Sequence, residues 1–344
     1  MTIPGRKILR NMFGLDYRSL ALLRIGLGTL ILCNLYVSAG DLRAFYTDEG
    51  LLPRSLLLSN FGRVFSLHMA GGSMAFAITI FAVQAVLALL MIAGYRTRIV
   101  TIASYVLLVS LQARNPLLIF GADIALRICF FWAMFLPLNR RFSLDAAVGR
   151  VSLPETSTYF RIPGIAYLVQ FAAIYLFSGL LKTGAAWKVD HTAVSYALSL
   201  EIWRRPLGAW LNQFDSLTTW LTRMTPSAEI YGPLLLILPV WSAWGRILGF
   251  ALFAGLQIGF NACMQMGLFG PVMIVVSFAL LPAEFWTYLV EPGGRRCARM
   301  LARFSNFVVW PKKFIDSVRN RMQQSRQVYG QLRSGRPAWP RLRL

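Results

Sequence analysis

Eight stretches of the chain are apolar enough to form membrane-spanning helices. About 20 apolar residues in an α-helix cross the hydrocarbon core of a bilayer, which is about 30 Å thick. Polar or charged connections separate the eight stretches, which cover 19–38, 72–93, 99–114, 118–138, 161–181, 229–244, 246–264 and 267–289. The third and the sixth are short, so crossing at a tilt, re-entry and other boundaries all stay open for them. The pattern predicts an all-α fold, a polytopic integral membrane helix bundle with about eight transmembrane helices.

The composition agrees with a membrane protein and excludes several other classes. Hydrophobic residues make up 56% of the 344 residues and charged residues 14%, whereas soluble domains contain roughly 25% charged residues. A disordered chain, a disulfide scaffold and an ordinary soluble enzyme are therefore excluded. The four cysteines lie far apart and only two histidines are present, so we expect no metal site and no haem held by two histidines.

The distribution of Lys and Arg predicts the orientation of the chain. There are 35 basic and 14 acidic residues, a net charge of +21. Cytoplasmic connections of membrane proteins collect Lys and Arg. Basic residues concentrate in segments that an eight-helix chain places on one side, namely 1–18, 95–98, 139–150, Arg246 and 295–344. We therefore expect both termini in the cytoplasm and no nucleic-acid partner. The localisation that we expect is a bacterial plasma membrane.

Three parts of the chain follow from this pattern. Residues 1–18 form a cytoplasmic basic N-terminus, 19–290 the transmembrane domain, and 291–344 a basic cytoplasmic tail. The tail is predicted to be helical to about Gln327 and to anchor the topology, with binding of anionic lipid as the alternative. Arg24, near the start of the first stretch, is expected to extend to the headgroups.

The longest non-cytoplasmic segment, 182–228, carries four tryptophans with arginines between them. Aromatic and basic side chains together are typical of the membrane interface. We predict an amphipathic helix over 206–224 that lies at the outer surface, with a soluble lid as the other interpretation.

Asp123 and Arg127 are the first candidates for chemistry, because charged groups inside a bilayer are costly. They lie four residues apart in the fourth stretch and so share one helix face. A self-neutralising structural pair is one interpretation. A polar cavity, or a path for a proton or an anion, is the other.

Lys182 closes the fifth stretch and lies between Gly179 and Gly184. A lysine at a helix end commonly extends to the membrane interface. In a partly dehydrated site, however, the ammonium form is disfavoured and the neutral amine can act as a base. The two glycines allow close approach of another helix or of a ligand.

Several motifs, in this order and spacing, resemble the HTTM (horizontally transferred transmembrane) family, whose membrane domain is shared with vitamin K-dependent gamma-carboxylase. The motifs are LRIGL at 23–27 with DLRAFYTDEG at 41–50, RN at 114–115 with GAD at 121–123 and FLPLNRRFSLD at 135–145, YLFSGLLK at 175–182 with Trp187, and MGLF at 266–269. Together they cover about 20–290. The resemblance implies a multi-helix membrane fold whose reactive side faces outward.

The resemblance also implies a role for Lys182. It matches the lysine that, in the carboxylase, deprotonates vitamin K hydroquinone. Pro116 and Gln257 stand where the carboxylase has histidines, and its large lumenal domain has no counterpart, so carboxylation of protein glutamate is not expected. Membership in the family does not name a substrate.

Two functional hypotheses remain. In the first, an outward-facing cavity contains Lys182 as the base, Asp123, Arg127 as an anion-stabilising group, and Asn115 and Trp187 as binding residues. Its ligand is a lipophilic quinol or a membrane lipid, with the quinol taken from the family resemblance. In the second, the chain is a non-enzymatic transport, sensing or partner-binding protein. Whether the chain is an enzyme stays open.

Overall fold

The computed structural model describes residues 4–62 and 65–290, and nearly all of these are helical or lie in short connections. The chain divides into two units, 1–287 and 288–344, and the arrangement below is that of the first. The basic tail, with the helix predicted to Gln327, lies outside the described residues.

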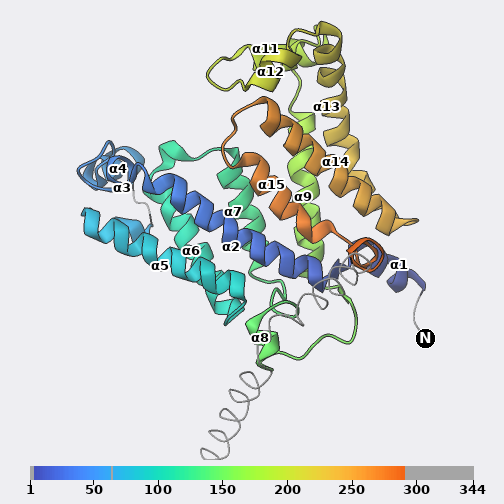
Figure 1. The fold of residues 1–344 in the computed structure, drawn as a ribbon, viewed down its shortest axis with the longest axis horizontal. Helices are drawn as coiled ribbons and strands as arrows, with labels where there is room; N and C mark the ends of the chain where they lie inside the picture. Colours follow the sequence, from blue (N-terminus) through green and yellow to red (C-terminus); the bar gives the residue numbers. More distant parts are fainter. Residues whose placement is uncertain (1–3, 63–64, 291–344) are drawn as a thin grey trace, which may run out of the picture. The chain divides into compact units, whose positions relative to one another are not determined.

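The first half of the unit contains helices α2, α5, α6 and α7 with shorter elements between them (Figure 1). Its elements are α1 (Pro4–Phe13), β1 (Leu15–Asp16), α2 (Tyr17–Ala39), α3 (Leu42–Tyr46), α4 (Arg54–Phe61), η1 (Leu67–Met69), α5 (Met74–Ala93), α6 (Thr97–Arg114), η2 (Pro116–Leu118), α7 (Gly121–Ala133) and α8 (Leu144–Ala147).

The second half contains α9, α13, α14 and α15. Its elements are β2 (Thr158–Tyr159), α9 (Ile162–Leu180), α10 (Ala185–Lys188), α11 (Ala193–Ser199), α12 (Pro206–Leu211), α13 (Asp215–Leu235), α14 (Ser242–Cys263), α15 (Phe269–Ser277), the 3-10 turn η3 (Phe278–Leu280) and the π-helical turn η4 (Phe285–Val290).

Four helices, α2, α5, α9 and α14, are long and apolar enough to cross a membrane, and a shorter apolar helix runs over 269–280. The integral membrane class and the helical fold agree with the sequence prediction. Four of the eight predicted stretches do not reach the length and hydropathy of a crossing helix within the described residues.

Two predicted boundaries were wrong. The helix expected over 118–138 covers Gly121–Ala133, and Pro137 lies just beyond its end, where proline disfavours helical conformation in the preceding residue. The stretch expected over 229–244 belongs to α13, which begins at Asp215 and ends at Leu235. The amphipathic helix expected over 206–224 is interrupted at 212–214, between α12 and α13.

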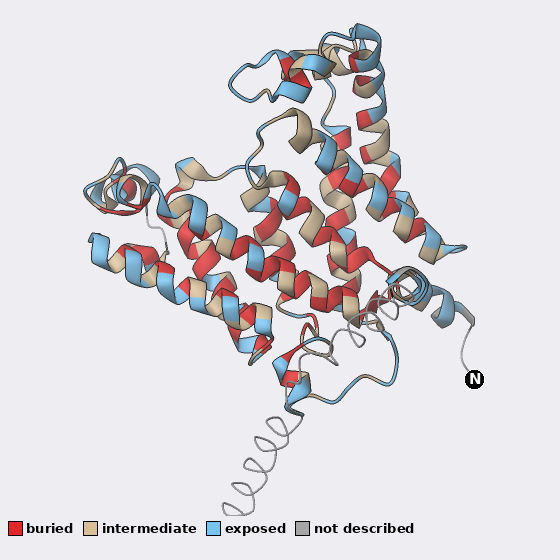
Figure 2. Ribbon diagram, in the orientation of Figure 1, coloured by how far each residue is buried: buried red, intermediate tan, exposed pale blue. Residues whose placement is uncertain are grey.

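Helix α2 lies between α5 and α15 and is the most continuously buried of these helices (Figure 2). Gly28 faces α5, where an added Cβ would come within 2.6 Å of a carbon of Ile92. Gly26 faces α15, where an added Cβ would come within 2.6 Å of Val275. Small residues at these two points let α2 pack closely against both neighbours.

Connections predicted on the same side contact one another. On the basic side, Asp145 accepts hydrogen bonds from Arg96 N and Thr97 N, each at 2.9 Å, and Leu15–Asp16 pairs with Thr158–Tyr159. On the other side, Asn115 donates to the Phe45 carbonyl at 3.2 Å. The turn at Trp203 meets the segment after α14, where Gln265 N donates to the Trp203 carbonyl at 2.6 Å and Arg204 forms a β-bridge with Met264.

Arg24 corrects an expectation. Its side chain is fully buried and does not extend to a solvated surface. The guanidinium donates to the Phe142 carbonyl and occupies the space beside Gly94. The charge therefore joins α2 to the connection after α7.

We predict that Asp145→Asn lowers the free energy of unfolding at neutral pH by about 1–2 kcal/mol, because the carboxylate caps the start of α6. Burial raises the pKa of Asp145, but the amides of Thr97 and Arg96 and the Thr97 hydroxyl outweigh it and lower the pKa overall. A lowered pKa in the folded state means that this stabilisation is present above an ordinary aspartate pKa of about 4 and is lost as the pH falls below it.

Thermal unfolding in detergent between pH 3 and pH 7 measures both effects. The matched control is Glu155→Gln, an exposed carboxylate in the same connection. Equal stability of Asp145→Asn and wild type at pH 7 contradicts the capping role.

Candidate functional site

Lys182 lies just beyond α9 and is held by three acceptors. Its Nζ donates to the Ser178 carbonyl at 3.1 Å and to the Ser178 hydroxyl at 3.0 Å. The third partner is the carboxylate of Glu229 on α13. The Lys182 side chain is 17% exposed and that of Glu229 is 5% exposed, so this is a largely buried ion pair.

Glu229 belongs to a polar face of α13 that also carries three threonines. Thr218, Thr222 and Thr225 are buried at helical spacing with Glu229. Each hydroxyl donates to a backbone carbonyl within the same helix, at 2.8 to 3.0 Å. The threonine hydroxyls thus find their acceptors within α13 itself. Glu229 is charged, and its carboxylate needs a partner from another part of the chain.

Gly179 brings the two helices close enough for this pair to form. An added Cβ there would lie 2.7 Å from a carbon of Ile230 and 3.1 Å from the Pro226 carbonyl oxygen. By contrast, an added Cβ at Gly184 meets nothing within 4 Å. Of the two flanking glycines, Gly179 therefore serves the predicted close approach of another helix.

A pocket of about 400 Å³ opens beside the ion pair. Its lining residues are Gly179, Leu180, Lys182, Trp187, Lys188, His191, Thr222, Arg223, Pro226 and Ile230. The Lys182 ammonium lies 5.3 Å from the centre of the Trp187 ring, within the range of a cation–π contact. The pocket thus combines an apolar wall, an aromatic ring and basic groups.

His191 lines the pocket, and its backbone conformation is strained. Its φ of 52° is in the left-handed region, which residues other than glycine rarely adopt. Nδ1 lies 2.9 Å from the Trp187 carbonyl oxygen. A carbonyl only accepts, so Nδ1 carries the proton and Nε2 is left for another partner.

The structure brings Lys182 and Trp187 together but places the other predicted site residues elsewhere. Asp123 lies in the first turn of α7, where its carboxylate accepts from Phe120 N at 2.9 Å. Within the described ranges no ion pair joins Asp123 to Arg127. Asp123, Arg127 and Asn115 do not line the pocket beside Lys182.

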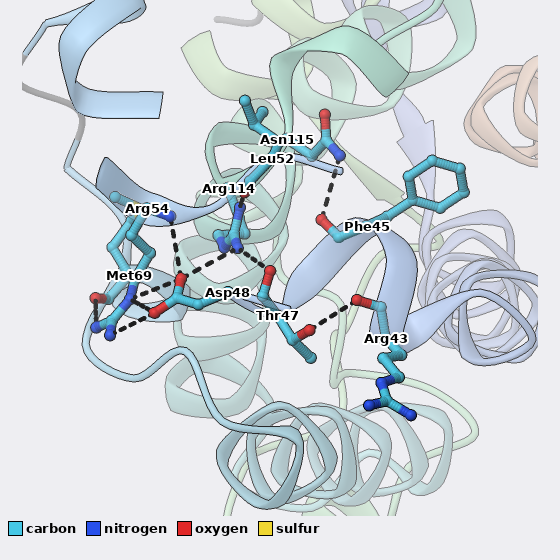
Figure 3. A network of polar contacts seen from close by, with 9 residues as sticks. All are labelled: Arg43, Phe45, Thr47, Asp48, Leu52, Arg54, Met69, Arg114 and Asn115. Atoms are coloured by element: carbon cyan, nitrogen blue, oxygen red, sulfur yellow. Dashed lines mark hydrogen bonds and ion pairs between the residues drawn. The ribbon is translucent and has the colours of Figure 1, made fainter. Parts of the chain in front are cut away.

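Asn115 belongs to a second polar network (Figure 3). The buried Arg114 donates to the carbonyls of Leu52 at 2.9 Å and Thr47 at 3.1 Å. Asn115 donates to Phe45 and accepts from Leu117 N at 3.3 Å, so both ends of its amide are engaged. The network fixes the 41–54 loop to the end of α6.

Asp48, which is partly exposed, belongs to the same network through its ion pair with Arg114. Arg54, which donates to both carboxylate oxygens, lowers the pKa of Asp48. A wide, open pocket of about 530 Å³ adjoins the pair and is lined mainly by the start of α4. Because Arg54 also donates to the Met69 carbonyl at 3.0 Å, its charge is engaged in holding the loop.

Sequence reasoning assigned no site role to Glu229, His191, Lys188 or Arg223. The signal for Glu229 was present, because threonines at 218, 222 and 225 continue to 229 at helical spacing. The predicted stretch 229–244 began a separate helix at Glu229 and so separated it from the threonines that precede it. Among the described residues, no group of three His, Cys, Asp or Glu side chains is placed to hold a metal ion.

Comparison with protein-family models, curated proteins and solved structures returns no significant match for this chain. The resemblance to the HTTM family therefore stays a prediction.

We predict that Gly179→Ala destabilises the protein by about 1–3 kcal/mol, since the methyl group overpacks the contact between α9 and α13. Gly184→Ala, the matched control, changes stability by less than about 0.5 kcal/mol because its site is open. Thermal unfolding of both variants in detergent makes the comparison. Equal effects of the two substitutions contradict the close contact at Gly179.

Proposed function

We propose that the chain is an integral membrane protein that binds a lipophilic molecule in the pocket between α9 and α13 and removes a proton from it. The observation that carries the proposal is the largely buried ion pair that Lys182, a lining residue of that pocket, forms with Glu229. A volume of about 400 Å³ lies within the range of small-molecule sites.

The hydrogen bonds of Lys182 define how the proton moves. An ammonium has three donors, and Ser178 O, Ser178 Oγ and Glu229 Oε2 take all three. Lys182 becomes a base when it first passes one proton to the Glu229 carboxylate. The neutral amine then accepts a proton from a hydroxyl of the ligand, so that the carboxylate is protonated, the ammonium is restored and the ligand carries the negative charge.

A lipophilic quinol is the ligand that we propose for this step. The resemblance of 175–182 to the carboxylase segment supports it, as does the flat ring of Trp187 beside the amine. The basic groups of the pocket would stabilise the quinolate that forms.

A non-enzymatic role, in transport, sensing or partner binding, is the second candidate. It is favoured by the saturation of all three Lys182 donors, which is also what a permanent structural ion pair requires. In that case the pocket binds its ligand without chemistry.

The substitution Lys182→Arg separates the two candidates. An arginine retains the ion pair but does not lose its proton in proteins, so the proposal predicts loss of proton removal with retained ligand binding. Under air, quinolate and O₂ give quinone and hydrogen peroxide, and the appearance of quinone follows the step. We expect quinone formation to fall at least about 100-fold in Lys182→Arg and Glu229→Gln, the lower end of general-base contributions.

Lys7→Ala, an exposed lysine on α1, is the control and is expected to retain wild-type activity. Equal quinone formation in wild type and Lys182→Arg rules out the base role. No quinone formation in either protein, with binding intact in both, supports the non-enzymatic candidate instead.

We further propose that eight segments cross a bacterial plasma membrane with both termini in the cytoplasm. These are α2, α5, α6, α7, α9, α13, α14 and α15. Support comes from the contacts between connections of the same predicted side, such as Asp145 with 96–97 and Trp203 with Gln265.

Truncation fusions to a fluorescent protein and to alkaline phosphatase test this topology. Fusions after Arg96 and after Leu344 are expected to fluoresce, because both points lie in the cytoplasm. A fusion after Lys182 is expected to give phosphatase activity. An external tail contradicts the even number of crossings.

A further inference from the structure

The pocket beside Lys182 has an uncompensated positive charge. Four of its ten lining residues are basic, namely Lys182, Lys188, His191 and Arg223, and none is acidic. Glu229, which does not line the pocket, neutralises Lys182 through their ion pair. Lys188 and Arg223 form no ion pair with any residue that the structure describes.

The carboxylate nearest in sequence does not cancel this charge. Asp190 is exposed and, in the described part of the chain, forms no ion pair with Lys188 or Arg223. His191 adds an unoccupied ring nitrogen, because the Trp187 carbonyl engages Nδ1 and no described residue bonds Nε2. Lys188, Arg223 and His191 therefore offer two cations and one imidazole nitrogen to a ligand in the pocket.

The pocket also has apolar lining residues, and one of them belongs to the exposed apolar surface of α9. Leu180 and Ile230 line the pocket, and Leu180 is 48% exposed. Phe177 and Leu181, on the same end of α9, are 59% and 77% exposed. Since α9 is long and apolar enough to cross a membrane, these side chains suit contact with acyl chains.

We infer that the pocket binds an anionic lipid of the bilayer, with the headgroup at Lys188, Arg223 and His191 and an acyl chain along Leu180 and Ile230. The inference goes beyond the proposed function, because the anionic lipid is a second ligand of the same pocket and is distinct from the quinol. Phosphate or carboxylate oxygens complement the two cations, and the apolar wall explains why the ligand carries a tail. A pocket of about 400 Å³ accepts a headgroup and the start of one acyl chain, and the rest of the lipid lies in the bilayer.

Native mass spectrometry of the full-length, delipidated protein in detergent tests the inference. Binding of phosphatidylglycerol is compared with that of phosphatidylcholine, and inorganic phosphate is added as a competitor. We expect wild type to prefer phosphatidylglycerol by at least about tenfold. The double variant Lys188→Gln/Arg223→Gln is expected to lose roughly 10- to 30-fold in affinity for it, the effect of two basic residues at a membrane surface.

Two further variants separate the pocket from general effects. Lys7→Gln/Arg98→Gln removes the same charge from exposed positions outside the pocket and is expected to bind as wild type. Lys188→Arg/Arg223→Lys retains the charge and is expected to keep the preference, which shows that loss in the Gln variant is not loss of fold.

Equal affinity of wild type and Lys188→Gln/Arg223→Gln for phosphatidylglycerol overturns the inference, as does an equal loss in the remote double variant. Displacement of the lipid by an equimolar amount of inorganic phosphate assigns the site to a free anion and overturns it too. The Lys182→Arg assay of quinone formation is independent of these titrations. Either proposal can therefore fail while the other stands.

Discussion

The ion pair between Lys182 and Glu229 determines how the second half of the bundle is assembled. Glu229 lies on the buried face of α13, where an ionised carboxylate without a partner costs several kcal/mol. Its partner comes from the residues directly after α9, and Gly179 lets the two helices approach. The charge requirement and the close contact together select one register of α9 against α13, and the pocket exists because of that register.

Buried arginines hold several connections between helices in place by hydrogen bonds. Arg24 donates to Phe142, Arg114 to Thr47 and Leu52, and Arg246 to Gly14, in each case to a backbone carbonyl of a segment far away in the sequence. A guanidinium has five donors in a planar fork, so one side chain can satisfy carbonyls that a loop leaves unpaired. Arg246, which the charge pattern attributes to topology, thus also joins α14 to the segment before β1.

The sequence predicts features that depend on neighbouring residues better than it predicts contacts between residues far apart in the chain. The bounds of α2, α5, α9 and α14 were predicted within four residues, because each helix must present a continuous apolar surface and hydropathy measures that directly. The pairing of Asp123 with Arg127 was inferred from local spacing, but Asp123 finds a nearer partner in the free amide of Phe120 at the start of its own helix. Glu229 lies 47 residues from Lys182, and nothing in local periodicity relates two residues at that separation.

The proposed topology does not by itself explain why cations surround the pocket. The positive-inside rule accounts for Lys and Arg in cytoplasmic connections and gives no reason to place them on the outer side. Lys188 belongs to the connection proposed as external and Arg223 to the first half of α13, and no described residue forms an ion pair with either. Lys182 differs from them, since Glu229 and Ser178 engage all its donors. A cation that serves neither topology nor an internal ion pair, and that lines a pocket beside apolar side chains, is best explained by a negatively charged ligand supplied from outside the chain.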